Sequence, residues 1–574
     1  MFKKNETHRQ GQLFGVAMHL NAEKQKRLAN SMGGYFYRHI FCNIVEEDFS
    51  VLYSDKHSAP NAPINCMVSA LLLQQKHGWT YAELFEQIDF NIEVRYALGL
   101  RDLDSVPFTE PTLFNFKRRL AKHRSLVGEC LVEKQFNRLT KQQLSEAEIK
   151  TAIQRTDSLL LNSNIRSYGR VALIVEVLLR FYGSLSEADQ QEYGEVLSAY
   201  IGKKADTYIR HIKPGEQMTH LQKLGEAYRL LYSNLADSYQ NESAFKLFAR
   251  VYTEHFEVIE NEPKVCVIQP KPNEALHSRC LQSPDDIEAT FRNKRGEQYQ
   301  GYVAMVTETC HPDNALQLIT DVHTAVNTTD DTQLLQDRLN HLKQKTPDLA
   351  ELHQDGGFGN DQNDLTCQEL DITPIQTAIK GCLPKTPIAI EYHATTHTYT
   401  AQCANPQHPQ VTATNPSKNY KAQFDLRICA TCPFQDTCPT KVCRKYEKGV
   451  AIYKFKPQDY LRQQRHKNLT QLPPERQKLR PNVEATMAQM RAGENRKGKL
   501  KVRGLINTCL YCITMAIMIN FGRVMRYKKA IFDQIHLSFL LQRPQCRVCR
   551  LLKALLTNSL TQTSLQQQPL YSIS

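Results

Sequence analysis

Hydrophobic positions along the chain change period several times, and each change predicts a different kind of element. Over residues 64–98 the apolar side chains recur at helical spacing, with a break at Gly78. A further helix should begin at Thr109, which can cap it, and Pro111 falls in the first turn, where no backbone N–H is needed. The basic run 117–119 on that helix permits a DNA-contacting helix-turn-helix, although a solvated helix face has the same pattern.

The middle of the chain carries strand patterns. Residues 150–158 alternate as a strand does and carry Asp157 near their end, and residues 159–161 continue the apolar signal. Residues 301–307 and 316–324 should pair as an antiparallel hairpin. A helix opened by residues 328–331 leads to a strand that ends at Asp355, and residues 371–375 predict one more strand. Helical periodicity over about 170–260 predicts an inserted helical unit. This order favours an α/β fold with a mixed sheet flanked by helices, which could place Asp157 and Asp355 side by side.

Composition narrows the class of protein. A chain of 574 residues is longer than one hydrophobic core usually serves, so three or more domains or subdomains are expected. Its 72 Lys and Arg against 59 Asp and Glu give a formal charge of +13, which favours a polyanionic partner such as nucleic acid or an anionic membrane face. We expect no apolar stretch of the roughly 18 to 20 residues that span a bilayer, and no signal peptide, hence a soluble intracellular protein. The 17 scattered cysteines do not resemble a disulfide framework.

The motif around Asp355 is the first candidate for a metal-binding or catalytic site. Two glycines follow this acid at once, and they relieve Cβ crowding and permit unusual backbone angles, so Asp355 can be exposed at a strand end. An ordinary Asp-Gly surface turn has the same sequence. Asp321 also ends a predicted strand and competes for the same role, whereas Asp330 and Asp331 fit helix caps better.

Cysteine spacing predicts a possible metal site. Cys429 and Cys432 are spaced so that both sulfurs can reach one tetrahedral ion, and Cys438 with either Cys403 or Cys443 could complete four thiolates. Structural zinc and free thiols are both open at this point. Cys509 and Cys512 lie in an apolar helical run and fit buried core cysteines, and Cys546 and Cys549 have no second pair nearby.

The stretch 476–503 is the most basic in the chain, and Glu484 stands almost alone among its cations. Val483, Met487 and Met490 mark one face of a helix there. Glu484 could neutralise its neighbours, or it could be a functional carboxylate beside a phosphate-binding surface.

These motifs together resemble the DDE transposases of bacterial insertion sequences, whose catalytic core is RNase H-like. Residues 155–158 (Arg-Thr-Asp-Ser) resemble the first-acid strand, residues 355–358 (Asp-Gly-Gly-Phe) the second-acid turn, and Arg480 with Glu484 the third-acid helix. Gln477 stands where related groups have a Tyr, and Arg491 where they have a Lys. The resemblance covers about residues 60–526, including the helical region, the cysteine segment, Arg503-Gly504 and residues 520–523.

The resemblance implies an enzyme that cleaves DNA at the ends of an insertion sequence and transfers the 3′-hydroxyl ends into target DNA. Asp157, Asp355 and Glu484 would be catalytic and would hold Mg²⁺ or Mn²⁺, with Asp157 bridging two ions. Structural Zn²⁺ would sit on Cys403, Cys429, Cys432 and Cys438. The expected DNA contacts are Arg480, Arg491, Arg496, Lys497, Lys499, Lys501 and Arg503. The partner would be double-stranded DNA, both terminal inverted repeats and target, bound by a homodimer in the cytoplasm at the nucleoid.

The expected layout follows from the same comparison. Residues 1–60 form an N-terminal segment, 61–145 a helical DNA-binding domain, and 146–395 the first part of an RNase H-like core with a helical insertion at about 167–262. Residues 396–450 form the Cys-rich segment, 451–530 the rest of the core with its basic helix, and 531–574 a tail that is expected to be disordered from 557. The alternatives are a catalytically inactive, transposase-derived DNA-binding protein and a structure-specific nuclease on the same fold.

Overall fold

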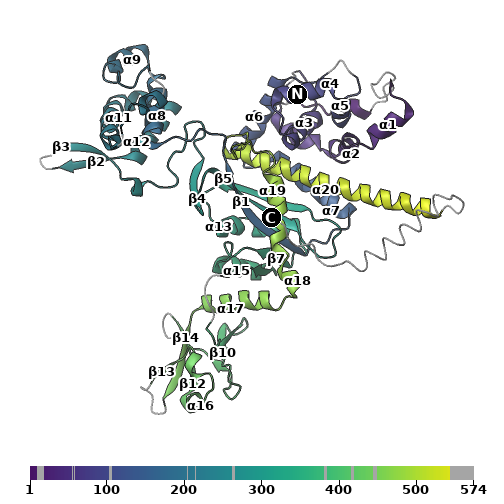
Figure 1. Cartoon of the computed structure of the whole chain (residues 1–574), viewed down its shortest axis with the longest axis vertical. Coiled ribbons are helices and arrows are strands. Elements are labelled where there is room, and N and C mark those ends of the chain that lie inside the picture. Colours follow the sequence, from purple (N-terminus) through teal and green to yellow (C-terminus); the bar gives the residue numbers. More distant parts are fainter. Residues whose placement is uncertain are drawn as a thin grey trace.

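The computed structural model describes residues 1–9, 19–54, 56, 59–102, 106–202, 205–213, 215–261, 265–379, 384–414, 419–443 and 449–542. A mixed sheet lies at the centre, helices of the N-terminal region and a separate helical unit lie above it on opposite sides, and a small β-rich unit lies below (Figure 1). The fold is α/β, as the sequence predicts. The predictions for Cys546, Cys549 and the end of the tail lie outside the described residues.

The central sheet has six strands: β1 (Ile153–Asn162), β4 (Thr290–Lys294), β5 (Glu297–Thr309), β6 (Ile319–Val326), β7 (Glu351–Gln354) and β8 (Thr373–Gln376). Its order is β6-β5-β1-β7-β8, and β4 also pairs with the beginning of β5. Strand β5 runs antiparallel to β1 and β6, whereas β7 runs parallel to β1 and β8. The predicted hairpin, β5 and β6, is therefore confirmed. Strand β4 was not predicted, because only its first residue is buried and it lacks an apolar pattern.

Alternation along β1 and β5 gives the sheet two apolar faces. Leu159 and Val306 point to one face and join the core that the N-terminal helices share with the last helix. Leu160 and Met305 point to the other face, against α13 (Asp331–Gln336) and α14 (Leu339–Lys345). The single predicted helix over 328–342 is thus two short helices.

The N-terminal region is helical, as predicted. Helix α3 ends at Gly78, whose left-handed φ of 65° suits a glycine cap. Thr109 occupies the N-cap of α6, but its side chain makes no capping hydrogen bond, so that detail of the prediction is wrong. The helices are α1 (Ala22–Ala29), α2 (Met32–His39), α3 (Ile64–His77), α4 (Tyr81–Phe90), α5 (Ile92–Ala97), α6 (Glu110–Val127) and α7 (Leu131–Glu146).

Helix α20 (Leu505–Gln542) crosses over the sheet and packs against the N-terminal helices (Figure 1). Its segment Leu505–Gln534 is long and apolar enough to cross a membrane, with a mean hydropathy of 1.6, which corrects the expectation that no such stretch exists. However, 78% of the most apolar 18-residue stretch of this segment is buried inside the protein. Cys509 and Cys512 are buried here, as predicted. The burial is what a core helix of a soluble protein shows.

The segment between β1 and β4 forms a helical unit with its own core. Aromatic rings stack in it: Tyr228 lies 4.3 Å from Phe248, and Phe181 lies 4.5 Å from Phe248, between ring centroids. A hairpin, β2 (Phe256–Asn261) with β3 (Val265–Pro270), follows the helices and was not predicted. The helices are α8 (Arg170–Tyr182), α9 (Glu187–Gly194), α10 (Ala205–Ile209), α11 (Gln217–Tyr239) and α12 (Ser243–His255).

The cysteine segment belongs to a small β-rich unit with an apolar core of its own. It contains two three-stranded sheets. Its elements are β9 (Ala389–His393), β10 (Thr398–Gln402), β11 (Val411–Thr412), β12 (Tyr420–Asp425), α16 (Leu426–Ala430), β13 (Lys441–Cys443) and β14 (Val450–Phe455).

Helix α17 (Pro457–Thr470) leads from this unit back to the central sheet, where it packs near β8 and α15 (Asp361–Glu369) (Figure 1). Three short helical elements follow: α18 (Pro474–Gln477), the 3₁₀ turn η7 (Arg480–Val483) and α19 (Glu484–Met490). Val483, Met487 and Met490 are buried, as the predicted helical face requires. The helix α20 continues past residue 530, so the expected boundary there falls within one element.

Candidate active site

Two of the three candidate acids lie on neighbouring parallel strands. Asp157 lies in β1, and Asp355 follows the last residue of β7. The two strands pair with Arg155 opposite His353. Two residues further along, the same register places Asp157 opposite Asp355 on the same face of the sheet. The third acid, Glu484, is the first residue of α19.

One guanidinium joins all three carboxylates. Arg480 Nη2 lies 2.7 Å from Asp157 Oδ2 and 3.7 Å from Asp355 Oδ2, and its Nη1 lies 4.0 Å from Glu484 Oε1. The side chain of Asp157 is 12% exposed, whereas those of Asp355 and Glu484 are 45% and 70% exposed. Three acids that are far apart in the sequence therefore form one cluster, which is closed at Asp157 and open to solvent at the other two.

Burial raises the pKa of the Asp157 carboxyl above its ordinary value, and the nearby charges of Glu484 and Asp355 raise it further. The Arg480 guanidinium and the backbone N–H of Ser158, which donates to Asp157 Oδ1 at 2.8 Å, act in the opposite direction. Carboxylates that repel one another in this way are stabilised when a cation comes between them.

The first glycine after Asp355 is needed for space, because a Cβ there would meet the backbone, whereas a Cβ on the second would meet only the end of a side chain. A Cβ on Gly356 would lie 2.2 Å from the carbonyl oxygen of Ala378, and one on Gly357 would lie 2.9 Å from Asp331 Oδ2. Neither glycine has a left-handed φ, so the expectation of unusual backbone angles is wrong at these two positions. The N–H of Gly356 donates to Asp355 Oδ1 at 2.7 Å, which fixes the carboxylate at the turn.

Asp321, the competing second acid, lies outside this cluster. It is on β6, which is separated from β1 by β5. Its carboxylate is fully buried and accepts from Arg338 Nη2 at 2.5 Å and from Lys345 Nζ at 2.6 Å. Although burial opposes it, these two cations hold the pKa of Asp321 well below its usual range. The oxygens of Asp321 are thus already paired, which favours a structural role.

The donor set of the cluster fits a divalent cation. Mg²⁺ and Mn²⁺ prefer oxygen ligands, and the three carboxylates supply them from separate elements, but in the described arrangement their oxygens do not all lie within 4.8 Å of one another, so they would have to close around an ion. Arg480 balances the negative charge in the described arrangement. The residues that would hold the ions are Asp157, Asp355 and Glu484.

The basic stretch after the third acid contains exposed cations as well as cations that bond to distant parts of the chain. Arg496 and Lys497 are exposed, and Arg491 lies 4.0 Å from Glu494. The remaining cations donate to backbone carbonyls of distant segments: Lys499 Nζ to Ile165 at 2.6 Å, Arg503 Nε to Asn164 at 2.6 Å, and Lys501 Nζ to Gly78. These three residues therefore also tie the stretch to the helical region and to the end of β1, which the sequence could not reveal.

The four candidate zinc cysteines lie in one unit. Burial, followed by the nearby thiols of Cys403, Cys438 and Cys432, raises the pKa of Cys429 to about 11. Cys429 Sγ also lies 3.4 Å from His408 Nε2. Within the described residues, only Glu133, Asp321 and His341 bring three potential ligand atoms within 4.8 Å of one another, so the four sulfurs do not converge on one point. The side chain of Cys443, the other candidate, lies outside the described residues.

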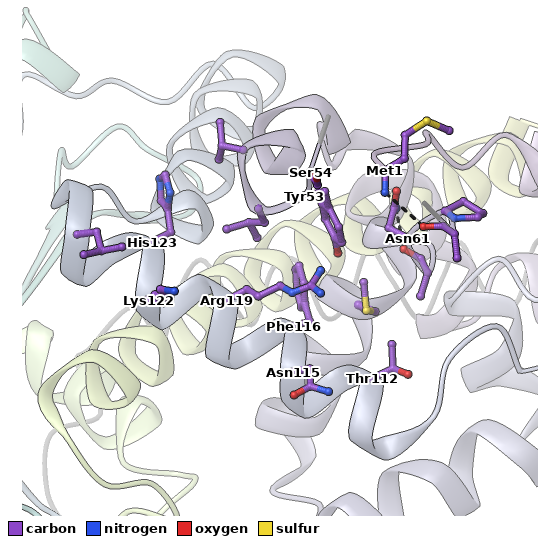
Figure 2. Close-up of a pocket in the computed structure, with 17 residues that line it drawn as sticks. Met1, Tyr53, Ser54, Asn61, Thr112, Asn115, Phe116, Arg119, Lys122 and His123 are labelled. Atoms are coloured by element: carbon purple, nitrogen blue, oxygen red, sulfur yellow. Dashed lines mark hydrogen bonds between the residues drawn. The ribbon is translucent and has the colours of Figure 1, made fainter. Parts of the chain in front are cut away.

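A groove of about 650 Å³ runs along α6, away from the acid cluster. Arg119 extends from the helix toward Tyr53, with its guanidinium 5.0 Å from the ring centroid (Figure 2). Lys122 and His123 line the same groove. Its cationic side chains make it a candidate nucleic-acid interface.

Comparison with known families gives two matches, each to a part of the chain. A family model described as "Transposase DDE domain" matches residues 402–525, and one described as "Transposase domain (DUF772)" matches residues 34–119. The first match contains Arg480, Glu484 and the cysteine segment, and the second runs from α2 into α6. Asp157 and Asp355 lie outside both. Nothing matched the chain in searches of the curated proteins and of the solved structures.

The protein is a transposase, an enzyme that acts on DNA. More particularly, the two matches support a DDE transposase of an insertion sequence, a group that generally uses a divalent metal ion.

Proposed function

We propose that this transposase cleaves DNA at the ends of an insertion sequence and transfers the freed 3′-hydroxyl ends into target DNA. The observation that carries the proposal is the cluster in which Arg480 reaches Asp157, Asp355 and Glu484 within 4.0 Å. The order and directions of β6, β5, β1, β7 and β8 support an RNase H-like core, with the first two acids on adjacent strands.

In this proposal the acids hold Mg²⁺ or Mn²⁺. When bound, the ions would activate the attacking water or 3′-hydroxyl and neutralise charge at the phosphate. Asp157 would be the innermost ligand, because its side chain is the most buried of the three. Arg480, once released from balancing the acids, would donate to a phosphate oxygen, together with Arg491.

The DNA-binding surfaces are proposed from charge. The α6 groove with Arg119 and Lys122 would receive the terminal inverted repeat, and the stretch that contains Arg496 and Lys497 would contact phosphates near the acids. Two DNA ends must be brought together for transposition, so we propose a homodimer on double-stranded DNA. The burial of α20 argues against a membrane span. Because the proposed partner is DNA, we propose a cytoplasmic protein at the nucleoid. The expected domain layout, with residues 61–145 as the DNA-binding domain, is part of the same proposal.

The test is an incubation of the purified protein with Mg²⁺, DNA that carries the element's own ends, and a target plasmid. The proposal expects nicks at the ends followed by joined products. Cleavage without joining would favour the structure-specific nuclease, and binding without cleavage would favour the inactive DNA-binding protein.

The pH dependence of metal binding should report on Asp157. The carboxylate must be ionised to hold a cation, and its raised pKa means that ionisation is lost at a higher pH than for an ordinary aspartate. Because Arg480 lowers this pKa, Arg480→Gln should move the acid limb of Mn²⁺ binding to higher pH. Calorimetric titration without DNA measures this limb. A limb that stays in place or moves to lower pH would contradict the assignment.

Zinc content tests the cysteine segment. We propose that Cys403, Cys429, Cys432 and Cys438 hold one structural Zn²⁺, which requires their sulfurs to move closer together than in the described arrangement. Purified protein should contain about one zinc per chain, since a four-thiolate site binds one ion. Cys429→Ser with Cys432→Ser should remove it, whereas Cys509→Ser, at a buried core cysteine, should not. Elemental analysis that finds no zinc in the wild type would refute the site.

A further inference from the structure

A buried polar network lies beside the acid cluster. Glu308 of β5 is fully buried, and Arg155 of β1 is its cross-strand partner. Arg155 Nε and Nη2 lie 2.8 Å and 2.6 Å from Glu308 Oε1. Because side chains alternate along a strand, Arg155 lies on the same face of the sheet as Asp157, two residues before it.

The second oxygen of Glu308 reaches the helix of the third acid. Oε2 accepts from Thr486 Oγ1 at 2.7 Å and from Arg523 Nη1 at 2.8 Å. Arg523 of α20 also donates through Nη2 to Thr486 Oγ1 at 2.5 Å. Thr486 is 1% exposed and lies in α19, two residues after Glu484.

The network holds the third-acid segment at both ends. Arg155 Nη1 donates to the carbonyl of Leu479 at 2.8 Å, directly before Arg480. Thr486 is held at the other end by Glu308. Arg480 and Glu484 lie between these two anchors. Glu484 itself is 70% exposed, so its position depends on the backbone that the anchors fix.

We propose that Glu308 is a positioning residue that, through Arg155 and Thr486, sets the distance of Arg480 and Glu484 from Asp157. The inference rests on the proposed function of the acid cluster. Glu308 does not touch the three acids, so it acts only through the segment that it holds. A buried carboxylate shared by two guanidinium groups and a hydroxyl has its hydrogen-bonding capacity well used, and such charge-assisted bonds are short and directional.

Thr486→Val is the test, because it removes the two hydrogen bonds that tie α19 to the network, the one to Glu308 and the one from Arg523 Nη2. Valine has nearly the shape of threonine but lacks the hydroxyl, and both arginine pairs of Glu308 remain. Glu308→Ala is less useful, since it leaves Arg155 and Arg523 buried without their partner and is expected to unfold the core. Thr486→Ser keeps the hydroxyl and should restore the wild-type behaviour.

Thr514→Val is the matched control for the cost of the substitution. Thr514 is a buried threonine of α20 whose hydroxyl donates to the carbonyl of Leu510 in its own helix, outside the network. We expect Thr486→Val to lower the cleavage rate about 10-fold or more and to raise the Mg²⁺ concentration for half-maximal rate, as changes behind metal ligands do. Thr514→Val should change neither, and DNA binding should be unchanged in both.

The outcomes separate the two claims. Wild-type cleavage with an unaltered Mg²⁺ dependence in Thr486→Val overturns the positioning role and leaves the proposed function intact. If the wild type does not cleave, the proposed function fails, and Mn²⁺ binding measured by calorimetry then decides the inference. Weaker Mn²⁺ binding in Thr486→Val than in Thr514→Val supports positioning, and equal or absent binding overturns it.

Discussion

Asp157→Asn is expected to lower the rate of DNA cleavage by about 10³-fold, the equivalent of about 4 kcal/mol of transition-state stabilisation. Asparagine keeps the shape and one oxygen but removes the charge that, in the proposed function, would hold the cation. It also leaves Arg480, which lies 2.7 Å from Asp157 Oδ2, with a weaker acceptor. Single-turnover cleavage of DNA that carries the element's ends measures the rate.

Asp371→Asn is a matched control for this change. Asp371 lies in a turn outside the acid cluster with a φ of 53°, a conformation that asparagine tolerates well. It should cleave at the wild-type rate. Asp157→Asn should still bind the DNA, because phosphate contacts come from the basic surfaces. Full activity of Asp157→Asn would show that the first acid lies elsewhere.

Asp321→Asn is expected to destabilise the protein by about 3 kcal/mol or more, as the removal of one partner from a buried ion pair does. Asp321 is fully buried, and the side chains of Arg338 and Lys345 are only 14% and 13% exposed, so both cations would lose their main counter-charge. The midpoint of urea unfolding measures the loss. Below that midpoint the rate of cleavage per folded molecule should match the wild type.

Asp313→Asn is the corresponding surface control. Asp313 pairs with Lys150, and both side chains are more than half exposed, so the unfolding midpoint should hardly move. If Asp321→Asn instead abolished cleavage and left the unfolding midpoint in place, Asp321 would be the second acid and the assignment of Asp355 would be wrong.

Much of the fold could be predicted from local patterns of apolar and polar residues. Alternation predicted β1, and the antiparallel hairpin of β5 and β6 followed from two apolar runs around one turn. The acids were each ambiguous alone, since an Asp-Gly turn or a lone glutamate among cations has ordinary explanations. Their assignment depended on the family motif, and the structure adds that Arg480 brings Asp157, Asp355 and Glu484 together.

What the sequence could not reveal depends on long-range contacts. Glu308 is one acid in a strand, and nothing local indicates that Arg155, Thr486 and Arg523 meet it. No pattern along the chain predicts the pairing of Asp321 with Arg338 either. The close approach of Gly356 to the carbonyl of Ala378 also cannot be predicted from the sequence. The sequence therefore led us to expect unusual backbone angles at Gly356, whereas the structure shows that a side chain would not fit there.

The measurement that tests the account most directly is single-turnover cleavage and joining with Mg²⁺ by the wild type, Asp157→Asn, Asp355→Asn, Glu484→Gln and the Asp371→Asn control. The account predicts that the wild type and the control nick the element's ends and join them to target DNA, while each of the other three binds the ends and does neither. Cleavage by any of those three near the wild-type rate would contradict the claim that the three carboxylates form one active site.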